Sequence, residues 1–221
     1  MLHELSMGGI GLSLKKLKGR PSGDEQPLHQ EHVLDVSEAE FLANGYSGTS
    51  IDAIARKAGV SKLTIYRRFS SKEGLFLSVA LRALTDSNHI PSVSADDRPV
   101  EEVLTNFATE ILNGYIAPRN LAITRLVVGE APQFPDIARK YHEEAAKSLK
   151  PLVNYLRRLG LEGTLSIHDP DRAAMTLTIL CMDGIRFLIF PTQTTPEERL
   201  AWCREVVRVF MNGHCSLREG E

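Results

Sequence analysis

The chain has 221 residues, of which 43% are hydrophobic and 24% charged, and this suits one compact unit or two modest domains of a globular, soluble protein. A formal net charge of −2 argues against a protein that attracts nucleic acid through its overall charge, so any such attraction must be local. Three cysteines without metal-ligand spacing predict reduced thiols in a cytoplasmic protein, with redox sensing as the less favoured alternative.

Residues 1–29 combine several glycines and prolines with few aromatic residues, and they are predicted to form a disordered N-terminal arm. The arm is basic because of Lys15, Lys16, Lys18 and Arg20. These basic residues follow the weak apolar part rather than precede it, which argues against a signal peptide. Two interpretations stay open: an arm that contacts DNA phosphates or the minor groove, and a tail without a fixed role.

A first helix is predicted from about residue 30 to residue 44, where apolar side chains recur at helical spacing and Gly45 ends the pattern. The stretch after it has the signature of two short helices joined by a tight turn. Thr49 or Ser50 can cap the first of these helices, and Gly59 ends it. Ser61 can cap the second, which should run from about residue 62 to residue 69.

The second short helix has one apolar and one outward face. Ile65 and Phe69 point to one side and can pack on the preceding helix, while Arg68 lies at the rim. The outward side chains are Lys62, Leu63, Thr64, Tyr66 and Arg67. Residues 49–72 contain six basic residues and one acidic residue, a local charge of +5 that suits a polyanion. An ordinary solvated helical pair is the alternative.

Several spaced elements of this segment resemble the DNA-binding domain of the tetracycline-repressor (TetR) family. They are Thr-Ser-Ile-Asp-Ala-Ile-Ala, Ala-Gly-Val-Ser-Lys, Thr-Ile-Tyr-Arg-Arg-Phe and Ser-Lys-Glu-Gly-Leu-Phe, spread over residues 45–76. The resemblance implies an all-α homodimeric transcriptional regulator with a C-terminal domain that senses a small molecule. The sequence departs from the family pattern at Glu38 and Glu40, where apolar residues are usual, and this is expected to loosen the first helix.

Each DNA-binding residue has an expected role. Lys62 and Arg67 are candidate base readers, and Leu63 and Thr64 are candidate contacts to a thymine methyl. The resemblance implies phosphate contacts for the side chains of Tyr66 and Lys72, with Thr49 or Ser50 as a further contact. The full predicted set is Thr49, Ser50, Ser61, Lys62, Leu63, Thr64, Tyr66, Arg67, Arg68 and Lys72.

Residues 30–88 are expected to form the DNA-binding domain, which ends in a connecting helix that starts after Ser71. Residues 89–221 are expected to form an all-α domain for ligand sensing and dimerisation. Its helices are predicted at about 100–116, 120–131, 134–160, 170–190 and 196–212, with Pro151 kinking or interrupting the third. The whole chain should then contain about nine helices and no sheet.

The helices predicted at 170–190 and 196–212 carry more apolar surface than one subunit's core can cover, so they are predicted to form a four-helix interface between two copies of the chain. The first is interrupted by charged residues and too short to span a bilayer, and no membrane partner is expected. The predicted interface residues are Met182, Ile189, Cys203, Val207 and Phe210.

A mainly apolar small molecule is predicted to bind among the helices of residues 100–190 and to release the DNA. Residues 121–142 are similar to regulators grouped with AefR, which also favours a sensor domain. Aromatic and apolar side chains are expected to form the walls, and four charged side chains are either polar anchors or structural ion pairs, with structural pairs favoured. The predicted set is Phe107, Arg125, Glu130, Phe134, Tyr141, Met175, Asp183, Arg186 and Phe187.

No motif for an enzyme is found: the sequence has no phosphate-binding glycine loop, no paired-histidine metal site and no nucleophile elbow. No cofactor or metal is therefore predicted. The alternatives to a DNA-binding regulator are an all-α enzyme that binds a small molecule and a helical adaptor. Specific retention of DNA would separate the regulator from both alternatives.

Overall fold

In a computed structural model, residues 25–87, 98–183, 186–190 and 193–214 are described, and they form eleven helices without a strand. The all-α fold predicted from the sequence is confirmed, although the described part of the chain alone holds more helices than the nine expected. No helix among these residues has the length and apolar character needed to cross a membrane. The predicted arm at residues 1–24 and Cys215 lie outside the described residues.

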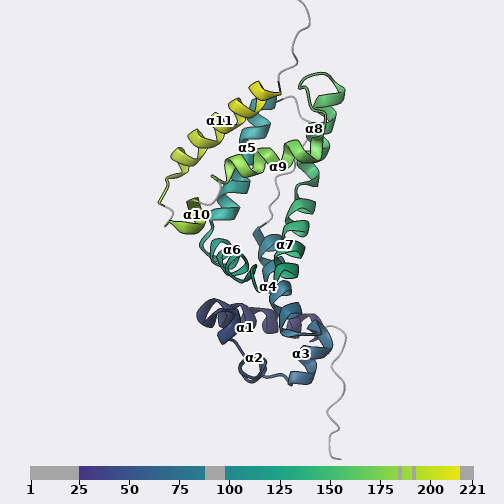
Figure 1. The fold of residues 1–221 in the computed structure, drawn as a ribbon, viewed down its shortest axis with the longest axis vertical. Coiled ribbons are helices and arrows are strands. Elements are labelled where there is room, and N and C mark those ends of the chain that lie inside the picture. Colours follow the sequence, from purple (N-terminus) through teal and green to yellow (C-terminus); the bar gives the residue numbers. More distant parts are fainter. Residues whose placement is uncertain (1–24, 88–97, 184–185, 191–192, 215–221) are drawn as a thin grey trace, which may run out of the picture.

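Three helices form one end of the molecule (Figure 1): α1 (Glu25–Gly48), α2 (Ile51–Lys57) and α3 (Lys62–Phe69). The long helix α4 (Lys72–Ser87) leads from this end towards the remaining helices. α1 begins at Glu25 rather than at about residue 30, so the predicted arm overlaps the helix. Gly45 has a φ of 71°, a left-handed conformation that glycine adopts without steric cost, and it kinks the end of α1.

The N-terminal core lies under α1 to α4 and is rich in aromatic rings. Phe41 and Phe76 meet edge to face with ring centroids 5.0 Å apart, and Tyr46 packs against both. Side chains from α6 (Pro118–Glu130) and α7 (Pro135–Ser148) complete it, so this core extends beyond residues 30–88. Its buried members are Val33, Leu34, Phe41, Tyr46, Ile51, Ile54, Ala55, Ala58, Ile65, Phe69, Leu75, Phe76, Val79, Ala80, Ala83, Ile123, Val127 and Ile137.

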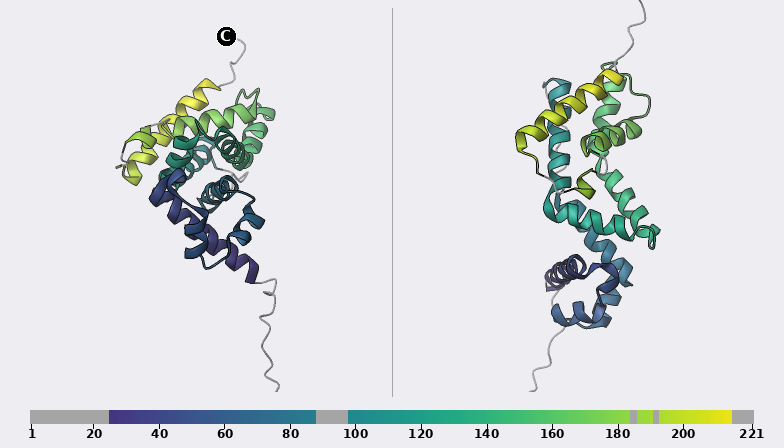
Figure 2. Two further views of the ribbon diagram at one scale, coloured as in Figure 1. Left: turned by 60° about the horizontal axis from the view of Figure 1, so that its bottom comes forward. Right: turned by 60° about the vertical axis from the view of Figure 1, so that its left-hand side comes forward.

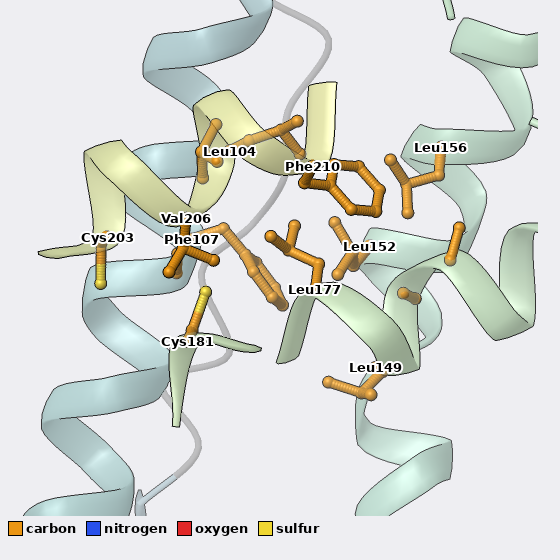
Figure 3. Packing of buried hydrophobic residues seen from close by; sticks show 14 of the residues in the cluster. Leu104, Phe107, Leu149, Leu152, Leu156, Leu177, Cys181, Cys203, Val206 and Phe210 are labelled. Atoms are coloured by element: carbon orange, nitrogen blue, oxygen red, sulfur yellow. The ribbon is translucent and has the colours of Figure 1, made fainter. Parts of the chain in front are cut away.

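The C-terminal core is mostly aliphatic and lies among α5 (Val100–Ile116), α8 (Lys150–Leu161), α9 (Pro170–Cys181), α10 (Arg186–Ile189) and α11 (Pro196–Gly213). α11 runs alongside α5, and α9 crosses between α5 and α8 (Figures 1 and 2). Ten side chains at its centre are labelled in Figure 3. They are Leu104, Phe107, Leu149, Leu152, Leu156, Leu177, Cys181, Cys203, Val206 and Phe210.

Two of the long helices expected from the sequence are each divided. The stretch 134–160 forms α7 and α8, and Pro151 lies in the first turn of α8, where its missing N–H is tolerated. The stretch 170–190 is not one helix: α9 ends at Cys181, and Asp183 has a φ of 55° that no α-helix can contain. The prediction of a single helix was therefore wrong at this point, because a short-range apolar pattern does not reveal a left-handed residue.

Candidate nucleic-acid interface

The turn between α2 and α3 is fixed by backbone hydrogen bonds and one glycine. Gly59 has a φ of 65°, and the amide of Val60 donates to the carbonyl oxygen of Ala55 at 3.0 Å. The hydroxyl of Ser61 accepts from the amide of Thr64 at 3.0 Å and so caps α3. The two helices therefore have one defined relative orientation, as the sequence predicts.

α3 is also held closely against α4. A Cβ atom added to Gly74 would lie 2.0 Å from the carbonyl oxygen of Phe69, so only glycine allows the first turn of α4 to approach the last turn of α3. Ile65 and Phe69 are buried against the N-terminal core. Burial of such apolar side chains contributes about 1.5–3 kcal/mol each, which fixes the inward face of α3.

The outward face of α3 is the one expected from the helical wheel. Leu63 is 66% exposed and Tyr66 46% exposed, values that are unusual for large apolar side chains without a partner. Lys62, Thr64 and Arg67 are exposed beside them. The sequence prediction and the structure therefore agree on which side chains of α3 are accessible to a second molecule.

Not every basic side chain in this region is available to a ligand in the unbound subunit. Three have partners of their own: Lys57 pairs with Glu40, Lys62 pairs with Asp52, and Arg68 donates to the side-chain oxygen of Gln30. Arg67 has neither an ion pair nor a side-chain hydrogen bond with any of the described residues. Arg67 is therefore the arginine of α3 whose guanidinium can donate hydrogen bonds to an external acceptor.

The two residues before α2 differ in accessibility. Ser50 is exposed and caps α2 by accepting from the amide of Ala53 at 3.1 Å. Thr49 is only 4% exposed, and its hydroxyl lies 2.7 Å from the carbonyl oxygen of Gly45 and 3.0 Å from that of Glu40. The predicted phosphate contact is therefore corrected to Ser50, because the Thr49 hydroxyl already stabilises the end of α1.

Lys72 lies beside an aromatic contact that the sequence did not reveal. Its ammonium nitrogen is 4.4 Å from the ring centroid of Tyr46, and the ring of Phe134 meets Tyr46 with centroids 4.6 Å apart. Burial raises the pKa of Tyr46. A hydrogen bond with Glu73 and the negative charges of Glu73 and Glu130 raise this pKa further. Phe134 thus contacts Tyr46, and the charge of Glu130 acts on the same phenol.

An ionic cluster joins the N-terminal helices to α6, and its Arg82 also pairs with Glu31 and Asp35 of α1. The carboxylate of Glu38 on α1 accepts from Arg82 on α4 at 2.8 Å and from Arg119 on α6 at 2.6 Å. Burial disfavours the charged form of Glu38, but the hydrogen bonds and charges of Arg119 and Arg82 outweigh it and hold its pKa below the usual value. The expected loosening of α1 is therefore corrected, since both unusual glutamates are paired: Glu38 here and Glu40 with Lys57.

The apolar residues predicted to line one ligand site are divided between the two cores. Phe107 and Phe187 are buried in the C-terminal core, and Met175 packs against it. Phe134 and Tyr141 pack against the N-terminal core instead. A single apolar pocket formed by all five side chains is therefore not what the structure contains, because the helical pattern does not tell which core a side chain joins.

Three of the four charged residues of the same predicted set, Arg125, Asp183 and Arg186, have structural partners. Arg125 donates to the carbonyl oxygens of Phe187 and Leu188 at 2.9 Å each and so fixes α10 on α6. Arg186 pairs with Asp183 three residues earlier. These contacts support a structural role for Arg125, Asp183 and Arg186, which the sequence analysis favoured over a role as polar anchors for a ligand.

Polar side chains from three helices meet between the two cores. The hydroxyl of Tyr141 on α7 lies 3.1 Å from that of Thr124 on α6. Burial, and secondarily the charge of Tyr141, raise the pKa of Tyr115 on α5. Burial raises the pKa of both tyrosines, so both phenols are neutral hydrogen-bonding groups near pH 7. Tyr115 and Thr124 were missed from the sequence because isolated hydroxyls on amphipathic helices carry no motif.

Three of the five residues predicted to face a partner subunit are inside the subunit itself. Cys203, Val207 and Phe210 are buried in the C-terminal core, where α11 packs on α5 and α9. Met182 is half-buried, and Ile189 is exposed. The assignment of Cys203, Val207 and Phe210 to an interface is therefore corrected, since their side chains already have neighbours.

The same pair of helices nevertheless carries a second apolar surface, which we call the exposed apolar face. It combines Ile179 and Leu180 of α9 with Trp202 and Val209 of α11. Each of these large hydrophobic side chains is between 37% and 61% exposed. An apolar face of this kind on two neighbouring helices is typical of a protein–protein contact.

Two family descriptions match the chain. Residues 33–79 match the one described as bacterial regulatory proteins, tetR family. Residues 102–213 match the one described as AefR-like transcriptional repressor, C-terminal domain. The first match covers the helices that carry the basic surface, and the second covers most of the C-terminal helices.

Similar proteins agree with both matches. The HTH-type transcriptional repressor ComR of Escherichia coli K12 is 24% identical over 160 residues, which cover 70% of this chain and 74% of ComR. A solved structure of the flavonoid-responsive regulator FrrA is 28% identical, with a TM-score of 0.75 over 87% of this chain and 99% of that one. A TetR-family regulator from Mesorhizobium loti MAFF303099 is 25% identical, with a TM-score of 0.74 over 86% and 98% of the two chains.

Proposed function

Because the chain belongs to the TetR family of bacterial regulatory proteins, a family of DNA-binding transcriptional regulators, we propose that it represses transcription from a near-palindromic operator as a homodimer and that a small molecule releases it. The observation that carries the DNA-binding part is the outward face of α3, where Leu63, Tyr66 and Arg67 are exposed together at the end of the molecule. The similar proteins described above are regulators rather than enzymes.

The helix α3 is the reading element of this proposal. Its eight residues span about 12 Å, which fits a major groove about 12 Å wide. Arg67 donates to the edge of a guanine, Leu63 contacts a thymine methyl, and Lys62 leaves Asp52 to reach the DNA. Tyr66, Ser50 and Lys72 contact phosphates and set the orientation of α3.

A homodimer supplies the second recognition helix. We assign the contact between subunits to the exposed apolar face, whose four large side chains otherwise meet water. Val209→Glu would place a charge in this contact and should convert a dimer into monomers in light scattering. Arg204→Glu, on an exposed polar position of the same helix, should leave the dimer intact. A Val209→Glu protein that stays dimeric would refute the assignment.

The effector is proposed to bind beside the hydroxyl groups of Tyr115, Thr124 and Tyr141. This position lies between the two cores, and α6 and α7 both pack on α4, which leads to the DNA-binding end. A ligand there can favour one arrangement of α4 over another and so change operator affinity, with a typical coupling of about 1–3 kcal/mol. The relative FrrA is a flavonoid-responsive regulator, and phenolic ligands of that kind carry hydroxyls that suit such a cluster.

In vitro selection from random DNA duplexes tests the DNA-binding part directly. The dimer should enrich a near-palindromic sequence whose half-sites are about one helical turn apart. A library that returns without any enriched sequence would contradict sequence-specific binding. For the effector, calorimetry with phenolic compounds should be followed by operator titration, and a compound that binds tightly without changing operator affinity would refute the coupling.

A further inference from the structure

Four aromatic rings meet where the DNA-binding end joins the remaining helices. Tyr46, in the last turn of α1, stacks on Phe41 with ring centroids 6.0 Å apart and packs against Phe76 of α4 at 5.2 Å. The fourth ring, that of Phe134, meets Tyr46 edge to face at 4.6 Å. Tyr46 is only 4% exposed, so these three neighbours confine its ring.

Phe134 comes from the other part of the molecule. It lies between α6 and α7, where its amide donates to the carbonyl oxygen of Glu130 at 2.8 Å and its own carbonyl oxygen accepts from the amide of Ile137 at 3.1 Å. Ile137 is buried in the N-terminal core. The ring of Phe134 therefore follows any movement of α6 or α7, the two helices that carry Thr124 and Tyr141.

Lys72 lies over the same Tyr46 ring. It is the first residue of α4, whose start is fixed by a hydrogen bond of 3.0 Å from the amide of Gly74 to the hydroxyl of Ser71. The ammonium nitrogen of Lys72 is 4.4 Å from the ring centroid of Tyr46. Lys72 makes no ion pair with any of the described residues, so this ring is the group that holds the end of its side chain.

We propose that Phe134 is a positioning residue for DNA binding: through the ring of Tyr46, it keeps the ammonium group of Lys72 where it can reach a DNA phosphate. This inference rests on the proposed function, which assigns a phosphate contact to Lys72. The negative face of an aromatic ring attracts a cation. An ammonium group has three N–H donors, so the donors that point away from the ring are available to a phosphate oxygen.

Positioning matters because a lysine side chain is long and flexible. A side chain that is already held over a ring loses less freedom when it binds a phosphate, and binding is stronger for that reason. Loss of one exposed cation–π contact corresponds to a change of about two- to fivefold in an equilibrium constant. The same contacts connect α6 and α7 to a phosphate contact, because a shift of Phe134 displaces Tyr46 and, with it, Lys72.

The first experiment needs no DNA. The lysines of the full chain are dimethylated with 13C-labelled formaldehyde, which keeps their positive charge, and the NMR signal of Lys72 is identified by its absence in Lys72→Arg. A methyl group above an aromatic ring is shifted upfield by the ring current. We expect an upfield Lys72 signal in the wild type that moves towards those of exposed lysines in Phe134→Leu. A Lys72 signal that is the same in both proteins would overturn the proposal.

Ile137→Val is the matched control for this experiment. It removes one methyl group from the same core and leaves every ring in place. Ile137→Val should lower the stability in urea denaturation, as Phe134→Leu does, while the Lys72 signal stays upfield. A Lys72 signal that moves equally in the two variants would show that the ring of Phe134 has no special role, and it would overturn the proposal.

The second experiment is a double-mutant cycle on DNA affinity, with a duplex that the wild-type protein enriches from a random library. Phe134→Leu should weaken binding about two- to fivefold in the presence of Lys72 and should have no further effect in Lys72→Ala. A merely structural loss does not depend on Lys72, so equal weakening in both backgrounds would overturn the proposal. Circular dichroism checks that each variant is folded.

A pair of variants at Tyr46 tests the ring itself. Tyr46→Leu should weaken DNA binding as Phe134→Leu does, and Tyr46→Phe, which keeps the ring, should recover most of the lost affinity. Equal losses in the two Tyr46 variants would overturn the proposal. A wild-type protein that binds no DNA would refute the proposed function, whereas a protein that binds DNA with additive effects of Phe134 and Lys72 would refute only the positioning role of Phe134.

Discussion

The helices α3 and α11 are both amphipathic, but they are surrounded in different ways. α3 packs on α2 and α4, its neighbours in sequence, and its other face is open and carries basic and polar side chains. α11 packs on α9 and on α5, of which α5 lies far away in sequence, and its other face still exposes Trp202 and Val209. The chemistry of the exposed face differs accordingly: α3 suits a polyanion, and α11 suits another apolar surface.

Because of this difference, substitutions on α3 should affect DNA binding, and substitutions on the inward face of α11 should affect folding stability. Changes on the outward face of α3 should alter DNA binding and leave the subunit folded, because those side chains make few contacts within it. Changes on the inward face of α11 should unfold the C-terminal domain before any effect on a partner can be measured. Substitutions on α3 and α11 should therefore have different consequences for DNA binding and for stability.

The largest effect is expected in α11. Phe210→Ala removes a ring that is 3% exposed in the C-terminal core and should lower the free energy of unfolding by about 3–5 kcal/mol in urea denaturation. Glu205→Ala, on an exposed position of the same helix, should change it by less than about 0.5 kcal/mol. Equal effects of the two substitutions would mean that Phe210 is not part of the subunit's own core.

A smaller loss of folding stability is expected at the ion pairs of Glu38, which connect α1 with α4 and α6. Glu38→Gln removes the carboxylate shared by Arg82 and Arg119 and should lower the free energy of unfolding by about 2 kcal/mol near pH 7, since the side chain is mostly buried. Glu144→Gln, at an exposed pair with Lys147, should cost about 0–1 kcal/mol. Chemical denaturation of both variants measures the difference.

The effect of Glu38 should also depend on pH in one direction. Its pKa is lowered in the folded protein below the ordinary value of 4.5, so the stabilisation is fully present above pH 4.5 and is lost as pH falls through the lowered pKa. The stability difference between wild type and Glu38→Gln should shrink on acidification. A difference that stays constant from pH 7 to acid would show that the charge of Glu38 contributes nothing.

The smallest effect is expected at a phosphate contact beside α3. Lys72→Ala should weaken binding to all DNA sequences alike and should lower the slope of log affinity against log salt by about 1 per subunit. Fluorescence anisotropy at several salt concentrations measures both quantities. Glu101→Ala, an exposed position on α5 far along the chain, serves as the control. A changed sequence preference with an unchanged salt slope would assign Lys72 to base reading instead.

The sequence predicted the open face of α3 correctly but not that of α11. For α3, the cap at Ser61, the turn at Gly59 and the buried Ile65 all lie within ten residues, so a helical wheel determines the open face. For α11, the wheel finds apolar residues on two faces and cannot tell which one α5 covers. Phe210 was therefore assigned to a partner subunit, although it belongs to the core.

The roles of Glu38 and Phe134 were also not predictable from the sequence, because both depend on contacts between distant parts of the chain. Glu38 looked unfavourable in α1 because its partners, Arg82 and Arg119, come from two other helices. Phe134 was predicted in a ligand wall, and only the fold brings it against Tyr46. The all-α class, the recognition helix and the interruption at Pro151 rest on local patterns, and these were predictable.

A paired in vitro selection with wild type and Arg67→Ala tests whether the outward face of α3 reads DNA. The wild-type protein should enrich a near-palindrome with a preferred base at each position. Arg67→Ala should lose about 1–3 kcal/mol of operator affinity and lose the preference at one symmetry-related position in each half-site, while its unfolding curve stays unchanged. Identical sequence preferences for the two folded proteins would show that Arg67 does not read a base.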